Sequence, residues 1–367
     1  MYRMFSIIVA VFIFMFTATS AKAEYDYGAD AIQQALPDEA TEILDNAQIT
    51  PENSGATGLS FSGVLDWLWE QLCGKIQKPL RLLVTLLGVV ILCAFVDSLQ
   101  PMEGSSVNSA FSVVGVLSAA VITVSAIHEV LSAVQDILSI AANFMLVFIP
   151  IFAGLVAVMG HVTTAGAVNA VALSATQLFS QLAVNYLAPL SGAVMGLSVV
   201  GSVEPRLDLS RLGELIKKFV MWALTLLMTI FMSILSAQTF VANASDNALM
   251  RTAKFMVSSG VPVVGGAISD AVYTVTGGLE LLKNSVGTYG MIAAAVIIIP
   301  VLTTLVCYRA ALFCAECVGE MFGLKPLSSL FKTCGAVMSI MLAVTASFLL
   351  LNTIAVLILL AFSSGSA

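Results

Sequence analysis

The sequence predicts an all-α, polytopic membrane protein with a small exported N-terminal segment. Of the 367 residues, 59% are hydrophobic and only 10% are charged, whereas soluble domains are about half apolar and a quarter charged. Several apolar runs approach the roughly 20 residues that a helix needs to cross a bilayer. The composition therefore excludes an ordinary soluble domain and assigns most of the length to helices of one bundle.

Residues 1–23 have the pattern of a secretory signal peptide. Arg3 provides a positive start, Phe5–Phe16 an apolar centre, and the Ala-Lys-Ala run at 21–23 a small-residue cleavage pattern. We expect cleavage before Glu24, with an uncleaved signal anchor as the alternative. In either form, the residues that follow are delivered across the membrane.

Residues 24–79 are expected to form an acidic exported segment with an amphipathic helix. Between Glu24 and Leu72 there are ten Asp or Glu residues and no Lys or Arg. Such a segment meets no positive-inside barrier to crossing. Its charge also argues against nucleic acid or an anionic lipid surface as its partner.

Within this segment, two short helices are expected at Ala29–Leu36 and Asp38–Ala47, separated by Pro37. Residues 59–73 combine apolar, aromatic and acidic residues, as in a helix at a membrane interface. Because the segment has little core of its own, we expect it to be partly ordered or ordered by partners.

Residues 80–367 are expected to form the multi-span helical domain. From an outside start, the count puts residues 204–218 and 314–335 in the cytoplasm, where their Lys and Arg residues follow the positive-inside tendency. Against it, the basic residues at 75–81 and at 251–283 would lie outside. A re-entrant fourth span would change the parity. The eight expected spans are Leu80–Ser98, Val107–Ile127, Ile137–Met159, Gly166–Tyr186, Leu187–Val203, Phe219–Val241, Tyr289–Phe313 and Ala336–Phe362.

One stretch inside this domain, Ser258–Gly287, is neither a clean membrane helix nor an ordinary polar loop. Gly260, Pro262 and the pair Gly265–Gly266 are expected to break a helix near its start. Broken backbone at membrane depth persists only where it is buried in protein or lines water. We expect a re-entrant or membrane-surface piece against which the spans pack; an amphipathic connector outside a plain bundle is the alternative.

Polar residues in the apolar runs are candidates for function. In the fourth expected span, Asn169, Gln177, Gln181 and Asn185 follow one helical face. This stripe either lines an aqueous path or bonds to neighbouring helices, and the second reading is favoured. Asp270, which follows the glycine pair, is the most interesting acid.

No catalytic, metal or cofactor site is expected. His128-Glu129 resembles the start of a zinc-protease motif, but residue 132 is Ser, so the second His is missing. Cys314 and Cys317 form a CxxC without the further ligands or the thioredoxin-like context that a site would need.

A short block of the sequence resembles the stage III sporulation protein AE family. Its residues are Arg251-Thr252-Ala253-Lys254, Val261-Pro262-Val263-Val264-Gly265, Asp270-Ala271 and Leu282-Lys283-Asn284 through Val286-Gly287. The order of signal peptide, acidic exported segment and multi-span body agrees more loosely. The block covers about 40 residues and makes Lys283 and Asn284 further candidates.

The resemblance implies a permease-like membrane component of a channel or secretion-like assembly between mother cell and forespore, needed for endospore formation. It implies the mother-cell membrane around the forespore, with the N-terminal segment in the intermembrane space. The implied partners are other stage III sporulation A-operon membrane proteins, including a cytoplasmic ATPase subunit, and the forespore-side stage II sporulation protein Q. A stand-alone secondary transporter, using Gln177, Gln181, Asp270 and Glu280, is the alternative.

Overall fold

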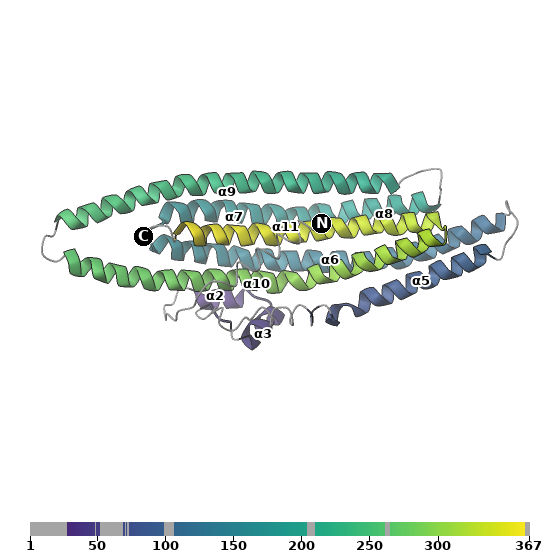
Figure 1. Cartoon of the computed structure of the whole chain (residues 1–367), viewed down its shortest axis with the longest axis horizontal. Coiled ribbons are helices and arrows are strands. Elements are labelled where there is room, and N and C mark those ends of the chain that lie inside the picture. Colours follow the sequence, from purple (N-terminus) through teal and green to yellow (C-terminus); the bar gives the residue numbers. More distant parts are fainter. Residues whose placement is uncertain are drawn as a thin grey trace.

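The computed structural model describes residues 28–47, 49–51, 69, 71, 73–98, 106–203, 210–260 and 265–363. Almost all of these residues are helical, and the long helices lie side by side in one elongated bundle (Figure 1). The predicted all-α class is therefore confirmed. The elements are α2 (Ala29–Gln34), α3 (Asp38–Asn46), α5 (Gln77–Ser98), α6 (Ser106–Val158), α7 (Val162–Leu182), the π-helix η1 (Ala183–Leu187), α8 (Ala188–Val203), α9 (Ser210–Gly260), α10 (Gly265–Met321) and α11 (Lys325–Ser363).

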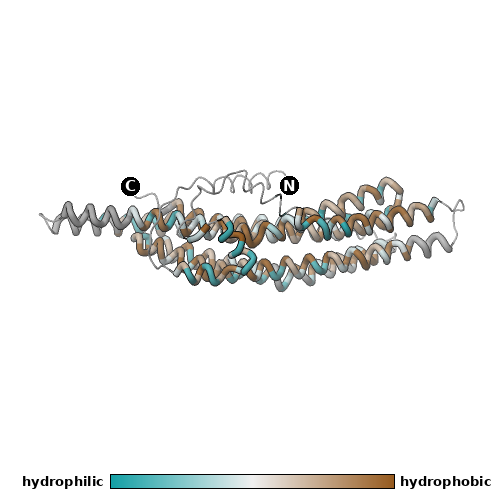
Figure 2. Tube along the Cα trace, turned by 90° about the horizontal axis from the view of Figure 1, so that it is seen from below, coloured by the Kyte–Doolittle hydropathy of each residue, from teal (hydrophilic) through white to brown (hydrophobic). Residues whose placement is uncertain are grey.

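Three helices are much longer than one bilayer crossing requires. α6, α9 and α10 contain 53, 51 and 57 residues. At 1.5 Å per residue they are about 75–85 Å long, against a hydrocarbon core of about 30 Å. Along the coloured part of these helices, hydrophobic residues predominate, with hydrophilic ones among them (Figure 2). Within the described residues, six helical stretches are long and apolar enough to cross a membrane, which supports a multi-pass membrane protein.

The expectation of eight separate spans is corrected, because four of them merge into two continuous helical stretches. The second and third expected spans both lie in α6, and the fourth and fifth lie in α7, η1 and α8. Residues 128–136 connect the first of these pairs and contain charged side chains but no Gly or Pro. Exposed charges do not interrupt a helix, whereas a missing breaker allows it to continue.

Because these expected spans merge, the connections between helices that lie at the same end of the bundle also differ from those expected. α6 turns into α7 through Gly160, which has a positive φ of 97°, a conformation that suits glycine. The C-terminal ends of α6, α9 and α11 lie at the same end of the bundle (Figure 1). The eight-span count would place the turn at 159–161 on the opposite side from the α9–α10 connection.

The broken stretch Ser258–Gly287 is not a separate re-entrant or surface element. Its break is found where expected, since α9 ends at Gly260 and α10 begins at Gly265, but Pro262 lies outside the described residues. From Gly265 onward the chain stays helical as far as Met321. Glycines in a first helical turn do not stop the helix that follows, because the first four N–H groups have no intrahelical partner in any case.

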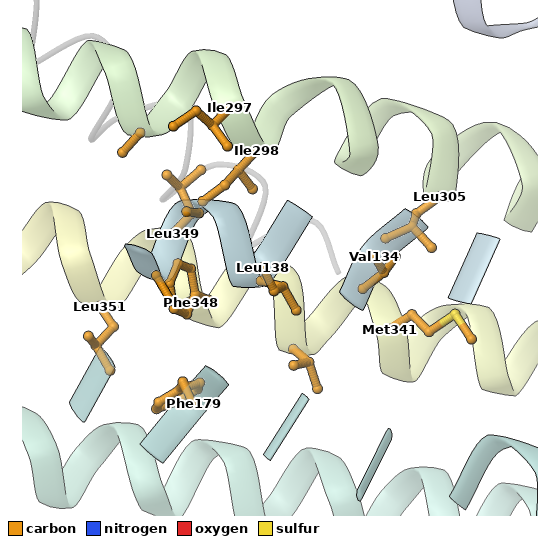
Figure 3. Packing of buried hydrophobic residues seen from close by; sticks show 14 of the residues in the cluster. Val134, Leu138, Phe179, Ile297, Ile298, Leu305, Met341, Phe348, Leu349 and Leu351 are labelled. Atoms are coloured by element: carbon orange, nitrogen blue, oxygen red, sulfur yellow. The ribbon is translucent and has the colours of Figure 1, made fainter. Parts of the chain in front are cut away.

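The core of the bundle is built around α11. This helix contacts α6, α7, α8, α9 and α10, and 72% of its most apolar stretch is buried, against 11% for α9. Figure 3 shows side chains from several helices meeting in this core. They include Val134 and Leu138 of α6, Phe179 of α7, Ile297, Ile298 and Leu305 of α10, and Met341, Phe348, Leu349 and Leu351 of α11.

The described part of the N-terminal segment is docked on the bundle. α2 contacts α6 and α3 contacts α10, and both short helices lie beside α10 in Figure 1. Ile32 and Leu44 are fully buried, and the Ser285 hydroxyl donates a hydrogen bond to the Pro51 carbonyl at 2.9 Å. The two short helices were predicted correctly, but their order comes from this chain's own helices, which supply the core that the segment lacks.

Candidate functional site

The sequence candidates divide between the interior and the outside of the bundle. Lys283 is fully buried in α10 and Asn284 is half-buried beside it. Gln177 and Gln181 are exposed on the outer face of α7. The structure therefore does not bring the two glutamines together with the candidates of α10.

The glycine candidates mark helix ends. Gly260 is the last residue of α9, Gly265 and Gly266 are the first two of α10, and Asp270 follows in the second turn of α10. Together they locate the hairpin between two of the longest helices.

Lys283 satisfies the C-terminal end of α11. Its Nζ donates a hydrogen bond to the Leu360 carbonyl at 3.3 Å. Since α11 ends at Ser363, the Leu360 carbonyl is one of the last four, which have no intrahelical N–H. A cation there also interacts favourably with the negative end of the helix dipole. The buried ammonium therefore ties α10 to the end of α11.

A second buried charged residue, Asp246 of α9, caps the N-terminal end of α7, whereas Lys283 caps a C-terminal end. Its two carboxylate oxygens accept hydrogen bonds from the backbone N–H groups of Thr163 at 3.0 Å and Thr164 at 2.8 Å. These N–H groups belong to the first turn and lack intrahelical acceptors, and a carboxylate at a helix N-terminus is stabilising. Asp246 is a cap supplied by another helix.

His161, in the turn from α6 to α7, is near enough to both charges to be influenced by them. It is only 3% exposed, and its Nδ1 has no hydrogen-bond partner among the described residues. Burial lowers the pKa of His161, Lys283 acts in the same direction, and Asp246 opposes them. The end of the bundle thus holds a buried polar cluster, His161, Asp246 and Lys283, contributed by three different parts of the chain.

Neither Asp246 nor His161 was among the residues that the sequence predicted to be functional. A signal was present for Asp246, because it is the first charged residue after Lys218. An ionisable residue at the end of such a long uncharged stretch is a candidate by default. Its partner could not be read from the sequence, since Thr163 lies more than 80 residues earlier.

Gly192 and Gly196, spaced as in a GxxxG motif, have no atom of the described residues within 4 Å of their Cβ positions, and close helix packing depends on other glycines. A Cβ on Gly290 of α10 would lie 2.0 Å from the Phe148 ring, and one on Gly287 would lie 2.9 Å from Phe152. Phe148 and Phe152 are stacked along α6. These glycines let α10 approach the aromatic side chains of α6.

The polar stripe of α7 is exposed together with those two glycines. Ser174, Gln177, Gln181 and Asn185 are followed along the same helical stretch by Gly192 and Gly196, all exposed. We call this set the α7–α8 stripe. Small residues and amides are the residue types that membrane helices place at contacts with other helices. The described helices leave Gln177, Gln181 and Asn185 exposed, so the favoured reading of these amides as contacts to neighbouring helices stays a prediction.

Charged side chains also make contacts between helices outside the buried polar cluster. Lys78 of α5 pairs with Glu129 of α6 at 2.5 Å, and Lys332 of α11 pairs with Glu214 of α9 at 2.8 Å. Arg309 of α10 donates from Nε to the Ser339 hydroxyl at 3.2 Å. Like the caps at the end of the bundle, these charges hold helices to one another.

The fold and the buried polar groups together define the class of this protein. It is a multi-pass helical membrane protein whose charged side chains cap its helices and connect them to one another. The family model described as Stage III sporulation protein AE matches residues 45–363, and the chain therefore belongs to this family of sporulation proteins. The resemblance seen in the sequence is confirmed.

A curated relative of the same description comes from Bacillus subtilis (strain 168). It is 28% identical to this chain over 226 residues, which are 61% of this chain and 56% of the relative. The chain thus aligns with little more than half the length of that relative. No solved structure matches this chain.

Proposed function

We propose that this protein is a membrane-embedded, permease-like component of the mother cell–forespore channel assembly required for endospore formation. Membership of the stage III sporulation protein AE family carries the proposal, and the six long apolar helices are consistent with it. In this proposal the protein lies in the mother-cell membrane around the forespore, with its N-terminal segment facing the intermembrane space.

The proposed partners are other stage III sporulation A-operon membrane proteins, including a cytoplasmic ATPase subunit, and the forespore-side stage II sporulation protein Q. The exposed α7–α8 stripe supports a place in an assembly. A neighbouring helix can supply hydrogen-bond partners for the exposed amides and can approach closely at Gly192 and Gly196.

The alternative is a stand-alone secondary transporter. The arrangement of the described residues favours the assembly, because Gln177 and Gln181 face outward from α7 while Glu280 is half-buried on α10. A transport path would need such groups to converge. Uptake of solute by the purified protein alone in liposomes is the result that would favour the transporter.

Localisation in a sporulating host tests the proposal. We expect a C-terminal fluorescent tag that folds outside the cytoplasm to be enriched in the membrane that engulfs the forespore. An even distribution in vegetative membranes would contradict the proposal. The control for export of the tag is a soluble protein without enzymatic activity that carries the same signal peptide and the same tag.

The hairpin between α9 and α10 is proposed to be central to this role. We expect replacement of both Gly265 and Gly266 by Leu to abolish sporulation while the protein still accumulates. Normal spore counts with normal protein levels would count against a central role for the hairpin.

A further inference from the structure

A cleft of about 830 Å³ lies where the exported segment meets the membrane bundle. Its walls come from α3, from the start of α5 and the residues just before it, and from α6 and α10. The volume is within the range of roughly 300–1,000 Å³ found for small-molecule sites. Four separate parts of the sequence must fold together to form it.

The floor of the cleft is apolar. It is formed on α6 by Ile137 and Ile140 and on α10 by Val296, Ile297 and Val301. Apolar surface of this kind is favourably covered by hydrocarbon, with a gain of about 25 cal/mol per Å² removed from water. The ligand should therefore contain an apolar chain.

The rim of the cleft carries charges of both signs. Lys75 and Lys78 lie on the α5 side, Asp38 and Glu39 lie at the start of α3, and Glu129 of α6 pairs with Lys78. A purely anionic headgroup would meet the carboxylates and a purely cationic one would meet the lysines. A headgroup that carries both a phosphate and an ammonium matches both sides of the rim.

The position of the cleft along α5 indicates where such a ligand comes from. α5 has 22 residues, about 33 Å of helix, which is the length of a single bilayer crossing. Its first turn therefore lies at the level of the lipid headgroups. Leu80, at the end of this first turn, is 53% exposed, so the cleft adjoins a lipid-facing surface.

We propose that this cleft binds a phospholipid with a zwitterionic headgroup. The phosphate lies toward Lys75 and Lys78, the ammonium lies toward Asp38 and Glu39, and an acyl chain covers the apolar floor. The bound lipid then joins the exported segment to the membrane bundle.

The first experiment removes the space for the lipid. The full-length protein is placed in nanodiscs of equal parts phosphatidylethanolamine and phosphatidylglycerol, extracted in mild detergent, and its retained lipid is identified by native mass spectrometry. Ala133→Trp fills the cleft from α6, and Ala244→Trp, at an exposed position on α9, is the matched control. We expect about a tenfold loss of retained phosphatidylethanolamine in Ala133→Trp only, corresponding to about 1.4 kcal/mol.

The second experiment changes the rim without filling the cleft. Asp38→Asn combined with Glu39→Gln removes the partners of the ammonium, so the retained lipid should shift from phosphatidylethanolamine toward phosphatidylglycerol. An unchanged lipid ratio, together with equal retention in Ala133→Trp and its control, would overturn the proposal.

A photoreactive amino acid at residue 133 separates a lipid from a protein occupant. A lipid adduct, read from its mass, is the expected product. A cross-link to another protein would show that the cleft is a docking site for a polypeptide, and the lipid assignment would be wrong.

Discussion

At the scale of single residues, the polar groups of this protein act mainly on its own helices. Lys283 caps the end of α11 and Asp246 caps the start of α7, and both are fully buried. Breaking a buried charged contact by removing one partner is costly, since the remaining groups lose their partners without regaining water. Two of our predictions concern single side chains in this part of the bundle.

Replacement of Asp246 by Ala should lower the free energy of unfolding by about 1–3 kcal/mol, because two buried N–H groups of α7 lose their acceptors. Asp246→Asn keeps one acceptor and should lose less. Thermal unfolding in detergent measures the difference, and hydrogen exchange of the Thr163 and Thr164 amides localises it. Unchanged exchange at both amides in Asp246→Ala would contradict the capping role.

Gly290→Ala should destabilise the protein by about 1–3 kcal/mol through overpacking, because its Cβ would lie 2.0 Å from the Phe148 ring. Gly278→Ala is the matched control on the same helix, since no atom lies within 4 Å of its Cβ position. The control should be neutral or slightly stabilising, as Ala favours a helix over Gly. Equal midpoints of thermal unfolding for the two variants would show that α10 does not pack on Phe148 as described.

At the scale of elements, the α7–α8 stripe differs from every buried helix face described above. It has small residues and amides, as a contact between membrane helices has, and yet it is exposed. A face of this composition is best explained by a contact outside this chain. A substitution in this stripe therefore tests the assembly of the protein with partners separately from its stability.

Gly196→Leu should leave the stability of the isolated protein unchanged, because nothing lies within 4 Å of that position. It should nevertheless reduce sporulation and co-purification with partner membrane proteins, since close helix approach at the stripe is blocked. Spore counts and unfolding midpoints measure the two effects. A fall in stability without an effect on co-purification would place Gly196 in an internal contact instead.

At the scale of the whole molecule, continuous helical stretches replace two expected pairs of spans. α6 runs through both its expected spans and brings the turn at 159–161 to the same end as the α9–α10 hairpin. The basic residues of the opposite end, among them Lys325, still agree with the positive-inside tendency, because merging two pairs of spans preserves the parity of later connections.

Cysteine labelling of intact cells tests this arrangement. Val162→Cys and Gly278→Cys, both exposed near one end, should react with a membrane-impermeant maleimide from the same side. Lys325→Cys, at the other end, should react only after the cells are opened. Labelling of the native cysteines in the unsubstituted protein is measured first and serves as the background. Protection of Val162→Cys together with labelling of Gly278→Cys would support the eight-span count.

The sequence by itself determined the class of the protein, the two short helices around Pro37, the helix break between Gly260 and Gly265, and the family. These follow from composition, from a local backbone preference and from a specific block of residues, all of which act within a few neighbouring positions. The sequence also identified Lys283 as a candidate, although it gave no reason for its burial.

Only the tertiary structure decided the continuity of α6, the outward direction of Gln177 and Gln181, and the partners of Asp246 and Lys283. Apolar periodicity cannot distinguish one long helix from two spans when no Gly or Pro lies between them. Apolar periodicity also does not show which face of an apolar helix packs against α11, because every face of such a helix is hydrophobic enough to be buried. Those choices depend on contacts between residues far apart in the chain, such as Asp246 with Thr163 and Lys283 with Leu360.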